Sequence, residues 1–138
     1  MADITGKVWG STATIFETPT MALHRLVINQ GFQCSHHAHA HKFNGFYVER
    51  GILEIHVAKN NYNLVDVTVL KAGDHMIVKP GEYHHFVCPT PSTDNLAASY
   101  SPTIAYEAYW PELLSEDIIR QNVGGSTGIP FQHDRKEP

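Results

Sequence analysis

Apolar and polar residues alternate with a period of two along the middle of the chain, and this restricts the region to β-strands. At positions 53–58, Leu, Ile and Val take every second place, with Glu, His and Ala between them. Residues 65–69 repeat the alternation with three valines, after the Asn-rich turn 60–63. Asn favours turns because it tolerates left-handed backbone angles. The two segments therefore predict a β-hairpin.

Turn residues divide most of the remaining chain into further short strands. We expect them at 11–17, 21–29, 46–48, 75–78, 84–88, 96–100 and 104–109. A total of about eight to ten short strands predicts an all-β sandwich or barrel, and a double-sheet jelly roll fits this length. One short helix is expected, with Ser115 as the N-cap of 116–120. We expect a single domain over 1–125 and a C-terminal tail over 126–138.

Composition excludes several classes of function. The 138 residues suffice for one domain with its own core. A net charge of −4 with scattered lysines and arginines leaves no basic stripe for nucleic acid. No apolar run is long enough to span a bilayer, and the N-terminus lacks the layout of a secretory signal. We therefore expect a cytoplasmic protein whose two cysteines, Cys34 and Cys88, are free thiols.

Histidines gather in two places, and these predict a metal site built from distant pieces of chain. Residues 36, 37, 39 and 41 are histidines, as are 84 and 85. On a strand, His37 and His39 would share a face and His36 would point away. His84 shares its parity with Phe86 and Cys88, which suggests an interior face. Parity therefore favours His84 over His85, and imidazole is the commonest transition-metal ligand.

The first histidine cluster resembles a motif of the cupin superfamily. That motif runs Gly, five residues, His-x-His, three or four residues, Glu, six residues, Gly. Gly31, His37, His39 and Gly51 fall in register, and Asn44 stands in the place of the Glu.

The second cluster is similar to the second cupin motif, which runs Gly, five residues, Pro-x-Gly, two residues, His, three residues, Asn. Gly73, Gly81 and His84 match it. Two positions depart: Lys79 occupies the place of the Pro, and Cys88 replaces the Asn. The resemblance implies the double-stranded β-helix, a jelly-roll barrel, as the fold.

The resemblance also implies one divalent transition metal held by His37, His39 and His84. Asn44 would be a weaker ligand, because it offers a neutral carbonyl oxygen, and His41 is a possible substitute. Zn or Fe(II) is favoured for such a set, with Ni, Mn and Cu as further candidates. The alternative is a metal-free cupin whose histidines only line a ligand cavity.

Other residues suggest a substrate site. Glu107 and Tyr109 share a face of the last strand; facing inward, they would serve as a general base and an acid or orienting hydroxyl. If that face points outward, they are only a polar surface with an aromatic anchor. Lys42, Phe46 and Phe86 are candidate substrate-binding residues. The run 7–10, Lys-Val-Trp-Gly, resembles the Lys-Pro-Trp-Gly opening of cupins of the mannose-6-phosphate isomerase type, or is simply an edge strand with one buried Trp.

Three functions remain open from the sequence. The resemblance favours a metal-dependent enzyme acting on a small polar molecule, with a sugar-phosphate isomerase-like activity first. Lys42, Lys79 and Arg25 are the candidate phosphate ligands. An Fe(II)-dependent dioxygenase or small-molecule lyase is the second possibility, and a non-enzymatic ligand-binding cupin is the third. By analogy with cupins we expect a homodimer.

Overall fold

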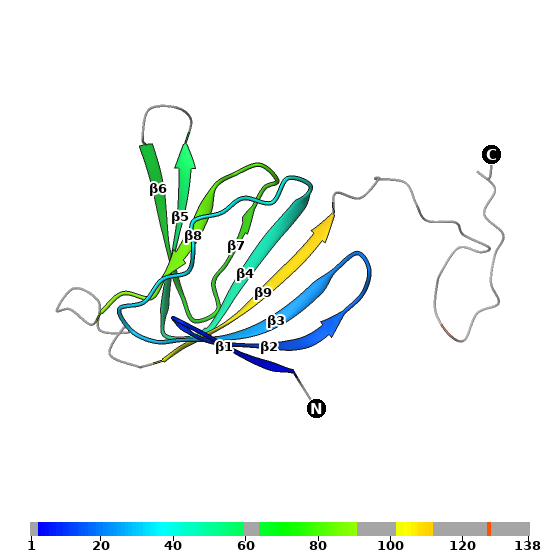
Figure 1. The fold of residues 1–138 in the computed structure, drawn as a ribbon, viewed down its shortest axis with the longest axis horizontal. Helices are drawn as coiled ribbons and strands as arrows, with labels where there is room; N and C mark the ends of the chain where they lie inside the picture. Colours follow the sequence, from blue (N-terminus) through cyan, green and yellow to red (C-terminus); the bar gives the residue numbers. More distant parts are fainter. Residues whose placement is uncertain (1–2, 60–63, 91–101, 112–126, 128–138) are drawn as a thin grey trace.

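The chain folds into two antiparallel β-sheets that lie face to face (Figure 1). The computed structural model describes residues 3–59, 64–90, 102–111 and 127. Within them the strands are β1 (Ile4–Lys7), β2 (Gly10–Glu17), β3 (Ala22–Ile28), β4 (Lys42–Arg50), β5 (Ile52–Lys59), β6 (Leu64–Lys71), β7 (His75–Val78), β8 (His84–Val87) and β9 (Thr103–Pro111). One sheet has the order β1-β2-β3-β9-β4-β7 and the other β6-β5-β8. The all-β prediction is confirmed.

The smaller sheet contains the hairpin predicted from the alternating pattern. β5 pairs with β6 along its whole length, from Ile52↔Lys71 to Lys59↔Leu64. On its other edge β5 pairs with β8, so that His56 lies opposite His85 and Val57 opposite His84. β8 therefore carries one histidine toward each face of this sheet.

The core lies between the two sheets and follows the period of two. On β5, Leu53, Ile55 and Val57 are buried, and Glu54 and His56 are only partly so. β3 and β4 contribute further buried side chains in the same alternating way, namely Leu26, Ile28, Phe46 and Val48. Burying such side chains stabilises the fold by roughly 1.5–3 kcal/mol each.

Gly51 lies where the chain passes from one sheet to the other. Its φ is +86°, and a Cβ there would lie 2.5 Å from Thr103 Oγ1. That hydroxyl donates to the carbonyl of Ile52 at 2.7 Å and accepts from its amide at 3.1 Å. A side chain at this position would both strain the backbone and displace Thr103, so glycine is required.

β6 presents its valines to the outside of the molecule. Val65, Val67 and Val69 are 53%, 49% and 46% exposed, while Leu70 is buried. The alternation located this strand, yet its valine face is not the face that packs on the core. Parity alone cannot tell which side of a strand meets the opposite sheet.

The histidine-rich segment before β4 is extended, but it is not a continuous strand. It contacts β8 through two isolated bridges, Gln33↔Val87 and His37↔His84. Several expectations lie outside the described residues: the strand 96–100, the helix that Ser115 would cap, the turn 60–63, and the tail from 126 apart from residue 127. Within the described part of the chain, no helix is long and apolar enough to cross a membrane.

Candidate metal centre

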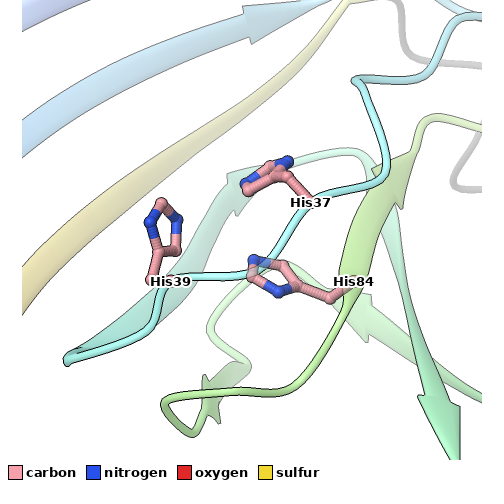
Figure 2. A group of neighbouring side chains, drawn as sticks. All are labelled: His37, His39 and His84. Atoms are coloured by element: carbon pink, nitrogen blue, oxygen red, sulfur yellow. The ribbon is translucent and has the colours of Figure 1, made fainter.

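Three histidine rings converge from two distant segments (Figure 2). His37 and His39 lie on the extended segment between β3 and β4, and His84 is the first residue of β8. One ring nitrogen from each lies within 4.8 Å of the other two. The ring centroids are 4.7 Å apart for His37 and His84, and 5.0 Å apart for His37 and His39. The structure thus brings together the three residues that the cupin resemblance singled out.

Backbone hydrogen bonds hold the two segments in register. The His37 amide donates to the carbonyl of His84 at 3.0 Å, and the His84 amide donates back at 2.8 Å. Gly81, in the turn before β8, donates its amide to the carbonyl of His39 at 2.8 Å. Gly81 has a φ of +82°, which glycine adopts without strain. The turn therefore fixes the position of His39 relative to His84.

Two of the rings are oriented by the same device. Nδ1 of His37 lies 2.7 Å from the carbonyl of Ser35, and Nδ1 of His84 lies 2.9 Å from the carbonyl of Glu82. A carbonyl oxygen only accepts, so each Nδ1 carries the proton and donates. The lone pair is left on Nε2, as is typical of metal-binding histidines. In His39 it is Nε2 that is buried without a hydrogen-bond partner.

Asn44 completes the arrangement from β4. It is fully buried, and its Nδ2 donates to Glu107 Oε2 and to the carbonyl of Ala108, both at 3.3 Å. Its Oδ1 is thereby turned toward Nε2 of His84 at 2.8 Å. With the proton of His84 on Nδ1, both facing atoms are acceptors. A cation bound between them would relieve this contact, so the residues present fit a divalent metal with Asn44 as an oxygen ligand.

The electrostatics of the cluster favour neutral imidazoles. Burial, and then the neighbouring His37 and His84, lower the pKa of His39. Burial also lowers the pKa of His84, with His37 and His36 adding to the effect. Metal ligands must be deprotonated, and these shifts keep the two rings neutral at a lower pH than an isolated histidine would be.

A cavity of about 490 Å³ opens beside His37, the member of the cluster that lines it. Glu107 and Tyr109 face into it from β9, together with His24 from β3, Phe86 from β8 and His37. Burial raises the pKa of the Glu107 carboxyl above its ordinary value, against the opposing hydrogen bonds from Tyr109 and Asn44. Burial, followed by the charge of Glu107, raises the pKa of Tyr109. The outward-facing alternative for this pair is therefore not what the structure shows.

The remaining candidate residues lie in different places. Phe86 lines the cavity, but Phe46 is buried in the core beside it, with ring centroids 6.2 Å apart. His41 and Lys42 are exposed, and the cavity lining includes neither of them. Both phenylalanines belong to the buried core, and Phe86 is the one that also lines the cavity.

Sequence reasoning missed part of the cavity lining. Lys7 and Trp9 contribute from the N-terminal hairpin, and Gln33 and Cys34 from the extended segment. Trp9 packs edge-to-face on Phe86 with ring centroids 4.9 Å apart. It lies in the turn between β1 and β2 rather than on an edge strand. The Lys-Val-Trp-Gly run was a signal for this location, although the isomerase type that it resembles is not shown.

Comparison with known proteins agrees with this fold. The family model "Cupin domain" matches residues 24–94, a span that includes the three histidines and both motifs. The chain therefore belongs to the cupin family, whose members often bind a metal at such a histidine group.

Solved structures of similar fold extend over most of the chain. KdgF from Halomonas sp. is 15% identical, with a TM-score of 0.62 over 80% of this chain and 87% of its own. An RmlC-like cupin from Shewanella frigidimarina is 21% identical, with a TM-score of 0.60 over 81% and 86%. An uncharacterised double-stranded β-helix protein from Klebsiella pneumoniae is 26% identical, with a TM-score of 0.56 over 72% and 75%. A search of curated protein sequences finds no match.

Proposed function

We propose that this cupin is a metal-dependent enzyme that moves a proton on a small polar molecule, and that the reaction is an aldose–ketose isomerisation of a sugar or sugar phosphate. The observation that carries the proposal is the position of Glu107. Its carboxyl is buried, faces the cavity, and is joined to the histidine cluster through the single amide of Asn44. An acid–base group beside a metal centre is what this reaction requires.

The metal would be held by His37, His39 and His84, with Asn44 as a fourth ligand. When bound, it would polarise a carbonyl or hydroxyl oxygen of the substrate as a Lewis acid. Zn or Fe(II) is our expectation for its identity, because imidazole and oxygen donors suit both.

Glu107 would act as the base and then as the acid. Burial raises the pKa of its carboxyl above the ordinary value, which makes the protonated form easier to reach for the return of the proton. In an isomerisation it would take the proton from the carbon that carries the hydroxyl and return it to the neighbouring carbonyl carbon, while the hydroxyl oxygen gives up its proton and the former carbonyl oxygen takes one up. The exchange is balanced without an oxidant.

Tyr109 would orient this carboxyl. The two side chains are hydrogen-bonded, and the raised pKa of Tyr109 keeps its hydroxyl protonated as a donor. Cys34 lies in the same cavity, and burial raises the pKa of its thiol to about 11. A protonated thiol would not compete with Glu107 as a base.

The cavity offers little positive charge for binding a phosphate group. Among the described lining residues, Lys7 is the one lysine or arginine. Lys79 is exposed on the turn before β8, and Arg25 interacts with Tyr106 rather than lining the cavity. We therefore expect unphosphorylated sugars to be accepted at least as well as their phosphates.

The test is proton exchange with solvent. Metal-loaded protein is incubated in D₂O with matched pairs of aldoses and ketoses, each with and without phosphate, and deuterium at the carbon next to the carbonyl is followed by NMR. Glu107→Gln should lower the exchange rate about 10²–10⁴-fold. Glu49→Gln, the same substitution on an exposed residue of β4, should leave it unchanged.

Exchange in no substrate pair, or undiminished exchange by Glu107→Gln, would overturn the proposal. The dioxygenase alternative is tested with the same protein loaded with Fe(II). Oxygen uptake with a thiol, a diketone or an aromatic diol, in the absence of sugar exchange, would establish it instead. The lyase and binding-only alternatives stay predictions from the sequence.

A further inference from the structure

A second row of histidines lies on the outer side of the wall that carries the three inner ones. His37 and His84 are opposite each other in an antiparallel bridge and exchange both backbone hydrogen bonds. In antiparallel pairing the neighbours on either side also face each other, so His36 lies opposite His85. On β5, His56 is in turn opposite His85. Because successive residues alternate faces, His36, His85 and His56 form one row on the outer face.

The first two rings of this row approach as closely as two ligands of one ion. Nδ1 of His36 lies 3.1 Å from Nδ1 of His85. Two imidazole nitrogens bound to one ion at about 2.0–2.1 Å are separated by about 2.8–3.4 Å for ligand angles from roughly 90° to tetrahedral. The observed separation falls within that interval. In the metal-free protein one of these nitrogens donates a hydrogen bond to the other, and an ion would replace the shared proton.

The surroundings keep both rings in place. Tyr83 stacks on His36, with ring centroids 5.8 Å apart and planes inclined by 27°. On the other side of His85, the ring of His56 packs at 4.8 Å.

His56 supports the pair rather than completing it. Its Nε2 donates to Glu54 Oε1 at 3.0 Å, and in the row it lies on the far side of His85 from His36. The nearby carboxylate places a negative charge beside the row, which favours a bound cation. The outer face thus offers two ligands and leaves other coordination positions open.

We infer that the outer face holds a second metal site, in which Nδ1 of His36 and Nδ1 of His85 bind a divalent transition metal ion of the Cu²⁺, Ni²⁺ or Zn²⁺ class. Imidazole suits all three ions. Open positions are left for water or for a donor from another molecule. The site is separate from the proposed enzyme activity, since it lies on the opposite side of the wall from the cavity.

The test is a calorimetric titration of the metal-free, untagged full chain with Cu²⁺. The wild type should bind two ions per chain. His36→Gln should bind one, because replacing one of two ligands weakens the site by about 10–100-fold or more. His75→Gln, the matched change at an exposed histidine of β7, should still bind two.

A second variant separates the outer site from the inner one. His37→Ala combined with His84→Ala should keep one ion, and adding His36→Gln to this pair should abolish Cu²⁺ binding. Electron paramagnetic resonance of the copper in the double variant should report nitrogen ligands that disappear in the triple variant. A wild type that binds one ion, or a His36→Gln variant that still binds two, would overturn the inference. If the wild type binds two ions but catalyses no sugar exchange, this result would count against the proposed function and not against the outer site.

Discussion

Two His-His pairs lie side by side in this protein, and the contrast between their inner and outer members shows what makes a metal centre. His37 and His84 face the interior, while His36 and His85 face outward across the same backbone. The residue types and the local strand pairing are the same. The surroundings differ: inside are a third histidine and the amide of Asn44, and outside are a tyrosine and a valine-bearing strand.

The difference shows that sequence spacing and strand pairing bring the histidines together, and that burial decides how firmly each ring is oriented as a ligand. His84 is only 1% exposed, and its Nδ1 is committed to a carbonyl. The outer rings have no such carbonyl among the hydrogen bonds described, and they contact each other instead. We therefore expect the inner site to bind an ion far more tightly, with the predictions below testing this ranking.

The largest effect is expected when the inner ligands are removed. His37→Ala with His84→Ala should abolish metal retention during purification, because two of the three imidazole ligands are lost. The same protein should also lose about 1–3 kcal/mol of its free energy of unfolding, since His84 is buried and hydrogen-bonded. Elemental analysis of untagged protein and denaturant unfolding measure the two effects. Full metal content in this variant would show that the inner cluster is not the principal site.

Glu107 provides the next test, through the pH dependence of stability in the metal-free protein. Its pKa is raised by burial above the ordinary 4.5. As the pH rises through 4.5, the unfolded chain releases this proton before the folded protein does, so the free energy of unfolding falls until the folded pKa is passed. Glu107→Gln removes this decline. Near neutral pH the variant should be more stable by about 1.4 kcal/mol for each unit of pKa shift.

Urea unfolding of both proteins across the acid-to-neutral range measures this difference, with Glu49→Gln as the control for a lost surface charge. If the curves of wild type and Glu107→Gln stay parallel throughout, then the carboxyl is not held in a desolvated environment. Its role as the inner acid–base group would then lose its physical basis.

A smaller effect is expected at the fourth ligand position. Asn44→Asp restores a carboxylate next to His84, and ligand charge strengthens cation binding. We expect about tenfold tighter metal binding at the inner site, measured by competition with a chelator. The added charge beside Glu107 should also raise the pKa of that carboxyl further. Gln33→Glu adds the same charge to the cavity lining without contacting His84, so an equal gain there would contradict a ligand role for Asn44.

The inner cluster could be predicted because two kinds of sequence signal agreed. Motif spacing selected His37, His39 and His84, and parity on β8 separated His84 from His85. The carbonyls of Ser35 and Glu82, which set the tautomers, carry no sequence signal, since every residue has one. They became visible only with the backbone path of the two segments.

It was harder to predict which face of each strand points toward the interior. The alternation showed that Glu107 and Tyr109 share a face. Whether that face points inward became clear only from the place of β9 between β3 and β4. The lining residues Lys7 and Trp9 depend on how the β1–β2 turn approaches Phe86, which is a tertiary contact. The outer histidine row was passed over because His36, His56 and His85 are distant in sequence, and it needed the strand register.

β6 shows the same difficulty, and it supplies the smallest expected effect. Val67 lies opposite His56 on the outer face and is 49% exposed, whereas Val57 on β5 is buried at 2%. Val57→Ala should lower the free energy of unfolding by about 2 kcal/mol, from two lost methyl groups and the cavity that remains. Val67→Ala should change it by less than about 0.5 kcal/mol, as at other surface positions. Denaturant unfolding measures both, and a loss at Val67 as large as that at Val57 would mean that the outer face is covered in solution, which would also close the outer histidine row to solvent ions.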